Sequence, residues 1–353
     1  MTDIALSHSY QQKSVYRRLA IGLAVATVLG LVFLLSIAVG PLSLSLPEVL
    51  SALGHVFNNE SLNDVEQLNA TVVWDLRLAR AVTALIVGGS LAACGAAMQG
   101  LFGNPLADPG IVGVSSGASL GAIFVIVLGL STFGVWTLPA GAFLAGIATT
   151  FIIYSLSKPG EGGADSSRLL LVGIAINAIS GAIAGLMTYL ATTDQLMSLT
   201  FWSMGSLSSA SWTTVAITIV PALAGLLMLQ FWAKQLDLLA LGEREARHLG
   251  VDVDSLRRWL VVITALLVAS AVSFSGTIGF VGLIVPHIIR LTIGPMHRYL
   301  LPLSALGGAL LLMLADIAAR TLDPPGEVPL GVLMGAIGGP FFLWMIWRGK
   351  DKR

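Results

Sequence analysis

Long apolar stretches without charge alternate with short polar connections along most of the chain. Stretches long enough to cross a bilayer as a helix lie at 19–39, 81–103, 110–130, 133–157, 169–193, 212–233, 299–318 and 328–347. The stretch 259–289 is too long for one crossing, and glycine, serine and threonine interrupt it at 273–279. We therefore predict two short crossings there and ten in total. This is the pattern of an all-α polytopic membrane protein with a single transmembrane domain, 1–353.

The positive charges test this count, because Lys and Arg collect in the cytoplasmic connections of membrane proteins. With an even number of crossings in 259–289, all but three of the 19 Lys and Arg residues fall on the side of the two termini. The N-terminal tail 1–18 and both termini are therefore predicted to be cytoplasmic. The exceptions on the outer side are Arg77, Arg80 and Arg320, and a functional interpretation must explain them.

Composition narrows the class of protein. Hydrophobic residues make up 56% of the chain and charged residues 11%, whereas soluble domains average about 25% charged residues. The net charge of zero gives no indication of nucleic-acid binding. The single Cys94 lies in an apolar stretch, the five histidines show no metal-ligand spacing, and no GxxxxGK[ST] pattern occurs. We expect no catalytic residue, metal site or bound cofactor in this chain.

A charged segment at 234–258 separates the two apolar halves. It holds ten of the 38 Asp, Glu, Lys and Arg residues, between the uncharged stretches 195–233 and 259–289. Its centre predicts a short amphipathic helix bracketed by Gly242 and Gly250. The residues alone leave three interpretations of this segment open. It could be a plain connection between spans, a helix on the lipid surface, or a docking site for a soluble partner.

Two polar residues within the apolar stretches are candidates for chemistry. Burying an acid inside the membrane costs free energy, so Asp316 is a candidate for a functional role as a proton relay. It also lies four residues before Arg320, and we favour an i,i+4 ion pair between the two. Asn177 either lines a path or bonds to a neighbouring helix. The glycines at 113, 117 and 121 share one helical face and predict close helix packing.

Six motifs in order resemble the FecCD-type permeases, the membrane subunits of ABC importers for ferric siderophores, haem and vitamin B12. They are RLAR at 77–80, GAAMQGLFGNPLADPGIVGVSSGAS at 95–119, FWSMGSL at 201–207, LGEREARHLGV at 241–251, GFVGLIVPHIIRL at 279–291 and EVPLGVLMGAIGGPFFLWMI at 327–346. The resemblance covers nearly the whole chain from about residue 40. It implies a type II ABC importer permease in the bacterial inner membrane. It also implies a homodimer, an external substrate-binding protein, and two cytoplasmic ATPase subunits that bind ATP and Mg²⁺.

The resemblance also implies roles for individual residues. Those matching the segment that couples to the ATPase are Gly242, Glu243, Ala246, Leu249 and Gly250. Those matching the arginines that dock the binding protein are Arg77, Arg80 and Arg320. Residues of the two spans that line the translocation pathway are Gly173, Asn177, Ala178, Gly181, Gly331 and Gly335. The chain departs from the family's RLPR at Ala79, which leaves the local geometry open.

The substrate is the least determined part of this interpretation. The stretch 194–207 resembles haem-importing members of the family. We therefore predict an importer of an iron chelate, with haem as the leading candidate. Ferric siderophore and vitamin B12 are the alternatives. A proton-coupled secondary transporter, with Asp316 as its relay, is the alternative class. The chain itself is expected to be a transport subunit and not an enzyme.

Overall fold

A computed structural model of the chain describes residues 2–54, 63–158 and 166–350. Residues 1, 55–62, 159–165 and 351–353 lie outside this description, and they include parts of the predicted outer segment and of the basic C-terminus. The described residues form helices and connecting turns without a strand. The helices are α1 (Thr2–Ala38), α2 (Leu46–Gly54), α3 (Asp64–Thr71), the π-helix η1 (Val72–Leu78), α4 (Ala79–Leu101), the short 3₁₀ helix η2 (Pro109–Val112), α5 (Val114–Val127), the short 3₁₀ helix η3 (Gly134–Trp136), α6 (Thr137–Leu156), α7 (Ser166–Leu190), α8 (Thr193–Met204), α9 (Trp212–Phe231), α10 (Ala233–Leu239), α11 (Glu243–His248), α12 (Val253–Ser275), α13 (Val281–Ile293), α14 (His297–Thr321) and α15 (Leu330–Lys350).

The ten predicted crossings correspond to ten apolar helices. Within the part of the chain that the structure describes, seven are long and apolar enough to span a bilayer, and the three shorter ones are α5, α13 and the apolar part of α15. The predicted break in 259–289 falls between α12 and α13. Gly276 there has a positive φ of 66°, and a side chain on it would overlap the backbone oxygen of Trp202. The break is therefore fixed both by the backbone conformation and by the segment packed against it.

Helix α4 is the centre of the packing. It is buried along almost its whole length and contacts α9, α12, α13 and α14. Gly88 and Gly308 face each other so closely that a methyl group on either would overlap the carbonyl oxygen of the other. A methyl group on Gly95 would likewise overlap the carbonyl of Gly282. Small residues let helix backbones touch in this manner. The predicted close packing at Gly117 and Gly121 is also present, against α6.

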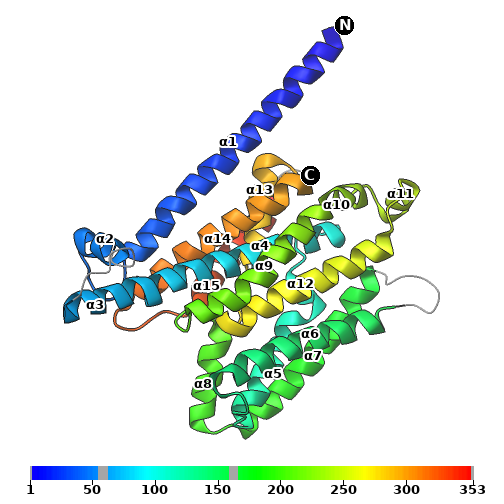
Figure 1. Cartoon of the computed structure of the whole chain (residues 1–353). Coiled ribbons are helices and arrows are strands. Elements are labelled where there is room, and N and C mark those ends of the chain that lie inside the picture. The colour runs from blue at the N-terminus through cyan, green and yellow to red at the C-terminus, as the bar shows by residue number, and fades with distance from the viewer. Residues whose placement is uncertain (1, 55–62, 159–165, 351–353) are drawn as a thin grey trace.

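The two ends of the molecule carry different elements (Figure 1). The beginning of α1, the end of α15, and helices α10 and α11 lie toward one end, while α2, α3 and α8 lie toward the other. Because the two termini share an end, the number of crossings is even, as the distribution of basic residues predicts. Helix α1 packs mainly on α14, and its first turns extend away from the rest of the molecule.

The contact between α4 and α14 can be tested at Gly88. We expect Gly88→Ala to lower the free energy of unfolding by about 1–3 kcal/mol, the usual cost of overpacking, because the methyl group meets the Gly308 carbonyl. The matched control is Gly30→Ala, on an exposed part of α1 where nothing lies within 4 Å, and we expect it to be neutral or slightly stabilising. Thermal unfolding of the purified protein in detergent measures both. Equal stability of the two variants would contradict the close crossing.

Candidate functional site

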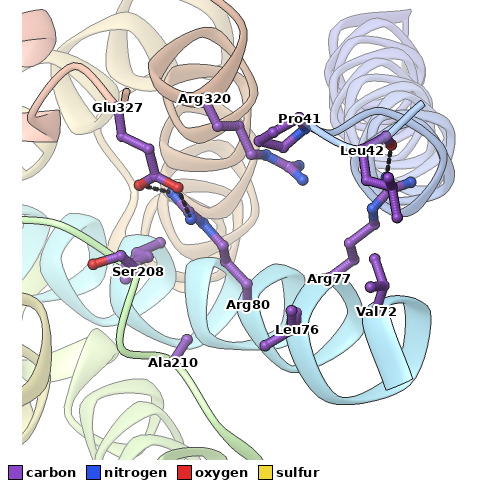
Figure 2. Close-up of a pocket in the computed structure, with 11 residues that line it drawn as sticks. Pro41, Leu42, Val72, Leu76, Arg77, Arg80, Ser208, Ala210, Arg320 and Glu327 are labelled. Carbon is purple, nitrogen blue, oxygen red and sulfur yellow. Dashed lines mark hydrogen bonds and ion pairs between the residues drawn. The ribbon is translucent and has the colours of Figure 1, made fainter. Parts of the chain in front are cut away.

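The three arginines predicted to lie on the outer side come together around one pocket. Arg77 comes from η1, Arg80 from the first turn of α4 and Arg320 from the last turn of α14, and Glu327 from the loop before α15 completes the group. Figure 2 shows the four side chains converging on this pocket. Residues 77 and 80 are one helical turn apart and thus share a helix face. Arg320 lies beside them because α14 packs closely on α4.

Two of these arginines hold the end of α1. Arg77 donates to the carbonyl oxygens of Ile37 at 2.9 Å and Ala38 at 2.7 Å, and also to that of Leu42. Arg320 donates to the carbonyls of Ser36 and Val39, both at 2.8 Å, and to the Ser36 hydroxyl. The last carbonyls of a helix have no partner within the helix and carry its negative dipole end. The two guanidinium groups therefore cap α1, and only 4% of Arg77 and 2% of Arg320 is exposed.

Arg80 makes a different set of contacts. Its Nε donates to Asp316 Oδ1 at 2.9 Å, and Nη1 and Nη2 donate to the two oxygens of Glu327 at 2.6 and 2.9 Å. Asp316 is fully buried and lies 3.4 Å from Arg320 Nε, so the predicted i,i+4 pair is confirmed. The bidentate pair with Glu327 is the most accessible part of the cluster, because 29% of the Glu327 side chain is exposed. Sequence reasoning missed Glu327, which is 247 residues from Arg80.

The departure at Ala79 causes no break in the backbone. The π-helix η1 runs directly into α4, and the Ala79 N–H donates to the Leu76 carbonyl. A proline at this position would lack that N–H. Alanine thus allows a continuous helix that carries Arg77 and Arg80 on either side of the junction.

At the opposite end, the charged segment folds into a small structured projection. Gly242 has a φ of 121° at the start of α11, and Ala246 is fully buried. Glu243 forms an ion pair with the buried Arg257 of α12, and Arg247 pairs with Asp254 at 3.0 Å. Leu241 and Leu249 nevertheless remain 62% and 57% exposed. The charged segment is therefore a projection that ion pairs hold in place and that leaves two leucines exposed.

The projection is tied to the rest of the molecule through α10. Asp237 on α10 accepts from the backbone N–H of His297 at 2.7 Å, and the same oxygen lies 2.8 Å from His297 Nδ1. His297 is the first residue of α14. A methyl group on Gly100 of α4 would overlap the His297 ring. The segment that carries α11 is therefore in direct contact with the two most central helices.

The six predicted pathway residues divide into two groups. Gly173 and Gly331 pack against the backbone oxygens of Ile111 and Met204, so each allows a close helix contact. Asn177 accepts from the Ser116 hydroxyl at 2.5 Å, which joins α7 to α5. The remaining three residues are not covered by neighbouring helices: Ala178 and Gly181 on α7 are exposed, and nothing lies within 4 Å of a methyl group built on Gly335 of α15.

Fold and site together define a polytopic membrane permease. The family model of the FecCD transport family matches residues 28–348, and the chain belongs to this family. It is 46% identical over 285 residues to the hemin transport system permease protein HmuU of Yersinia pestis, covering 80% of this chain and 85% of that protein. It is 41% identical to the vitamin B12 import system permease protein BtuC of Vibrio cholerae, covering 81% and 85%. A solved structure described as an inward-facing conformation of a metal-chelate type ABC transporter superposes with a TM-score of 0.81 at 33% identity, covering 93% of this chain and 99% of that one.

The buried carboxylate gives a test of the charge cluster. We expect Asp316→Asn to lower the free energy of unfolding by about 3–5 kcal/mol, because it removes the carboxylate that the buried Arg320 shares with the partly buried Arg80. Asp323→Asn, in the exposed loop nearby, is the control and should be close to neutral. Thermal unfolding in detergent measures both. An Asp316→Asn protein with full stability and no transport would instead support a proton relay.

Proposed function

We propose that this chain is the permease subunit of an ATP-driven importer that moves an iron chelate from an external binding protein into the cytoplasm. The observation that carries the proposal is the projection around α11. It presents exposed Leu241 and Leu249 and is anchored to α14 through Asp237 and His297. Such a projection can transmit motion from a soluble partner to the membrane helices. Membership of the FecCD family supports the same reading.

The proposed partners follow from surfaces that the single chain leaves uncovered. Two cytoplasmic ATPase subunits, which bind ATP and Mg²⁺, would contact the projection of this chain. The residues of the projection proposed to couple to them are Gly242, Glu243, Ala246, Leu249 and Gly250. A second copy of the chain would complete a pathway next to Ala178, Gly181 and Gly335, which are open in the single chain. Closure of the ATPase dimer would then switch the pathway from outward to inward opening. The chain itself would not hydrolyse ATP.

The outer pocket is the proposed docking place for the binding protein. Carboxylates of that protein would approach the cluster of Arg77, Arg80 and Arg320, where charge-assisted hydrogen bonds steer association. Arg77 and Arg320 already hold α1, so the exposed edge of the Arg80–Glu327 pair is the part that a partner reaches first. In this proposed orientation both termini would lie in the cytoplasm of a bacterium and the pocket would lie outside its inner membrane.

Haem is the proposed substrate. The similarity to a hemin permease at 46% identity supports it, and the similarity to vitamin B12 permeases at 41% identity supports cobalamin as an alternative, beside ferric siderophores. The proton-coupled class has weaker support, because the intramembrane Asp316 is paired with two arginines.

The projection can be tested at its tip. We expect Leu249→Asp to abolish copurification with the cognate ATPase subunit and transport-coupled ATP hydrolysis, because it places a charge in an apolar contact. Leu322→Asp is the matched control, because Leu322 is equally exposed at 63% but lies at the opposite end of the molecule. Both variants should elute and melt like the wild-type protein. Normal ATPase assembly by Leu249→Asp would contradict the proposed coupling role.

Growth under iron limitation tests the substrate. A strain lacking this chain, supplied with haem or a ferric siderophore as sole iron source, should fail on haem alone and recover when the gene is returned. Failure on the siderophore alone would replace haem by a siderophore and leave the importer assignment intact. Haem uptake that persists without ATPase activity and stops with an uncoupler would favour the proton-coupled class.

A further inference from the structure

A groove on the membrane-facing surface is bordered by α1, α4, α9 and α14. Its walls are leucines such as Leu29 of α1 and Leu226 of α9, and its floor is made of small residues including Ala305 and Ala309 of α14. The lining is apolar except for Gln230, near the end of α9. Helix α1 contacts mainly α14, and the groove lies between Leu29 of α1 and the leucines of α9.

Two of the bordering helices carry a basic residue in line with the groove, at the end where α10 and α11 lie. Arg18 precedes Leu29 by 11 residues, and Arg298 precedes Ala309 by 11 residues. Eleven residues are close to three helical turns, so each arginine shares a face with the groove residue of its own helix. On α9 the corresponding end is Gln230, which donates to the Arg298 carbonyl at 3.0 Å.

The two arginines converge on one aromatic ring. The guanidinium carbons of Arg18 and Arg298 lie 4.9 and 5.9 Å from the centre of the Tyr299 ring. Arg18 Nε also donates to the Ile293 carbonyl at 3.2 Å, and neither arginine has a carboxylate partner among the residues that the structure describes. Asp237, on the adjoining α10, bonds to His297 instead. Two like charges in this position favour a shared anion.

We propose that this groove binds one anionic phospholipid, with an acyl chain along Ala305 and Ala309 and the phosphate between Arg18 and Arg298. Eleven helical residues rise about 16 Å, close to half of the roughly 30 Å hydrocarbon core. The groove and its cations therefore match the depth of one leaflet. Under the orientation proposed above this is the cytoplasmic leaflet, whose lipids include anionic ones that attract basic residues. A helix from another protein would need the full thickness of the core and would gain nothing from the cations.

Native mass spectrometry of the purified full-length chain in detergent tests the site, with phosphatidylglycerol and phosphatidylcholine as probes. We expect phosphatidylglycerol to bind more tightly, and each of Arg18→Gln and Arg298→Gln to weaken its binding about fivefold with little effect on phosphatidylcholine. Arg258→Gln is the matched control, because Arg258 is an exposed arginine at the same end but on α12. It should leave both affinities unchanged.

The apolar part of the site is tested separately. Ala305→Leu fills the groove and keeps both arginines, so it should weaken the binding of both lipids in a protein that still melts and elutes normally. Equal binding of the two lipids by the wild-type chain, or an equal loss in Arg258→Gln, would overturn the proposal. The assay needs neither substrate nor ATPase, so its failure would leave the proposed importer function untouched.

Discussion

The close approach of α4 to α14 and α13 is the contact on which the rest of the structure depends. Within a bilayer, burial of apolar surface does little to bring helices together, because lipid tails are as apolar as leucine. Backbone contact at the paired glycines 88 and 308, and at 95 and 282, supplies van der Waals packing instead. Helices α4 and α14 are antiparallel and cross at Gly88 and Gly308. The start of α4 and the end of α14 must therefore lie side by side. Arg80 and Asp316 meet for this reason.

This contact between Arg80 and Asp316 explains how charged side chains can be buried at this end of the helices. A buried ion pair is not by itself a gain in stability, because removing charges from water is expensive. Here Asp316 pairs with both Arg80 and Arg320, and Glu327 supplies a second negative charge to Arg80. The remaining donors of Arg77 and Arg320 satisfy carbonyls that the end of α1 leaves free. The cluster therefore joins α1, α4, α14 and the loop before α15. A partner that binds at this pocket acts on four elements at once.

The predictions that succeeded depend on local sequence, and the missed features depend on distant contacts. Hydropathy and basic residues located the ten helices, the glycine-rich break at Gly276 divided α12 from α13, and the four-residue spacing paired Asp316 with Arg320. Nothing local indicates that Arg80 meets Glu327, or that Arg77 caps a helix ending 39 residues before it. Likewise, Gly331 and Gly335 look equivalent in sequence, but only the first touches another backbone.

Helix α14 connects the end of the molecule that carries the charged projection to the end that carries the arginine cluster. Its 25 residues rise about 37 Å from His297, bound to α10, to Arg320, bound to the end of α1. A helix held at both ends by polar contacts, and along its middle by backbone contact with α4, moves as a rigid element. Displacement of the projection would thus be transmitted to the pocket around Arg80 and Arg320 without deforming the core. Helices α7 and α15, which we propose line the pathway, have exposed faces and take no part in these contacts of α14 with α1, α4 and α10. Under the proposed function they are the elements expected to change position when the pathway opens.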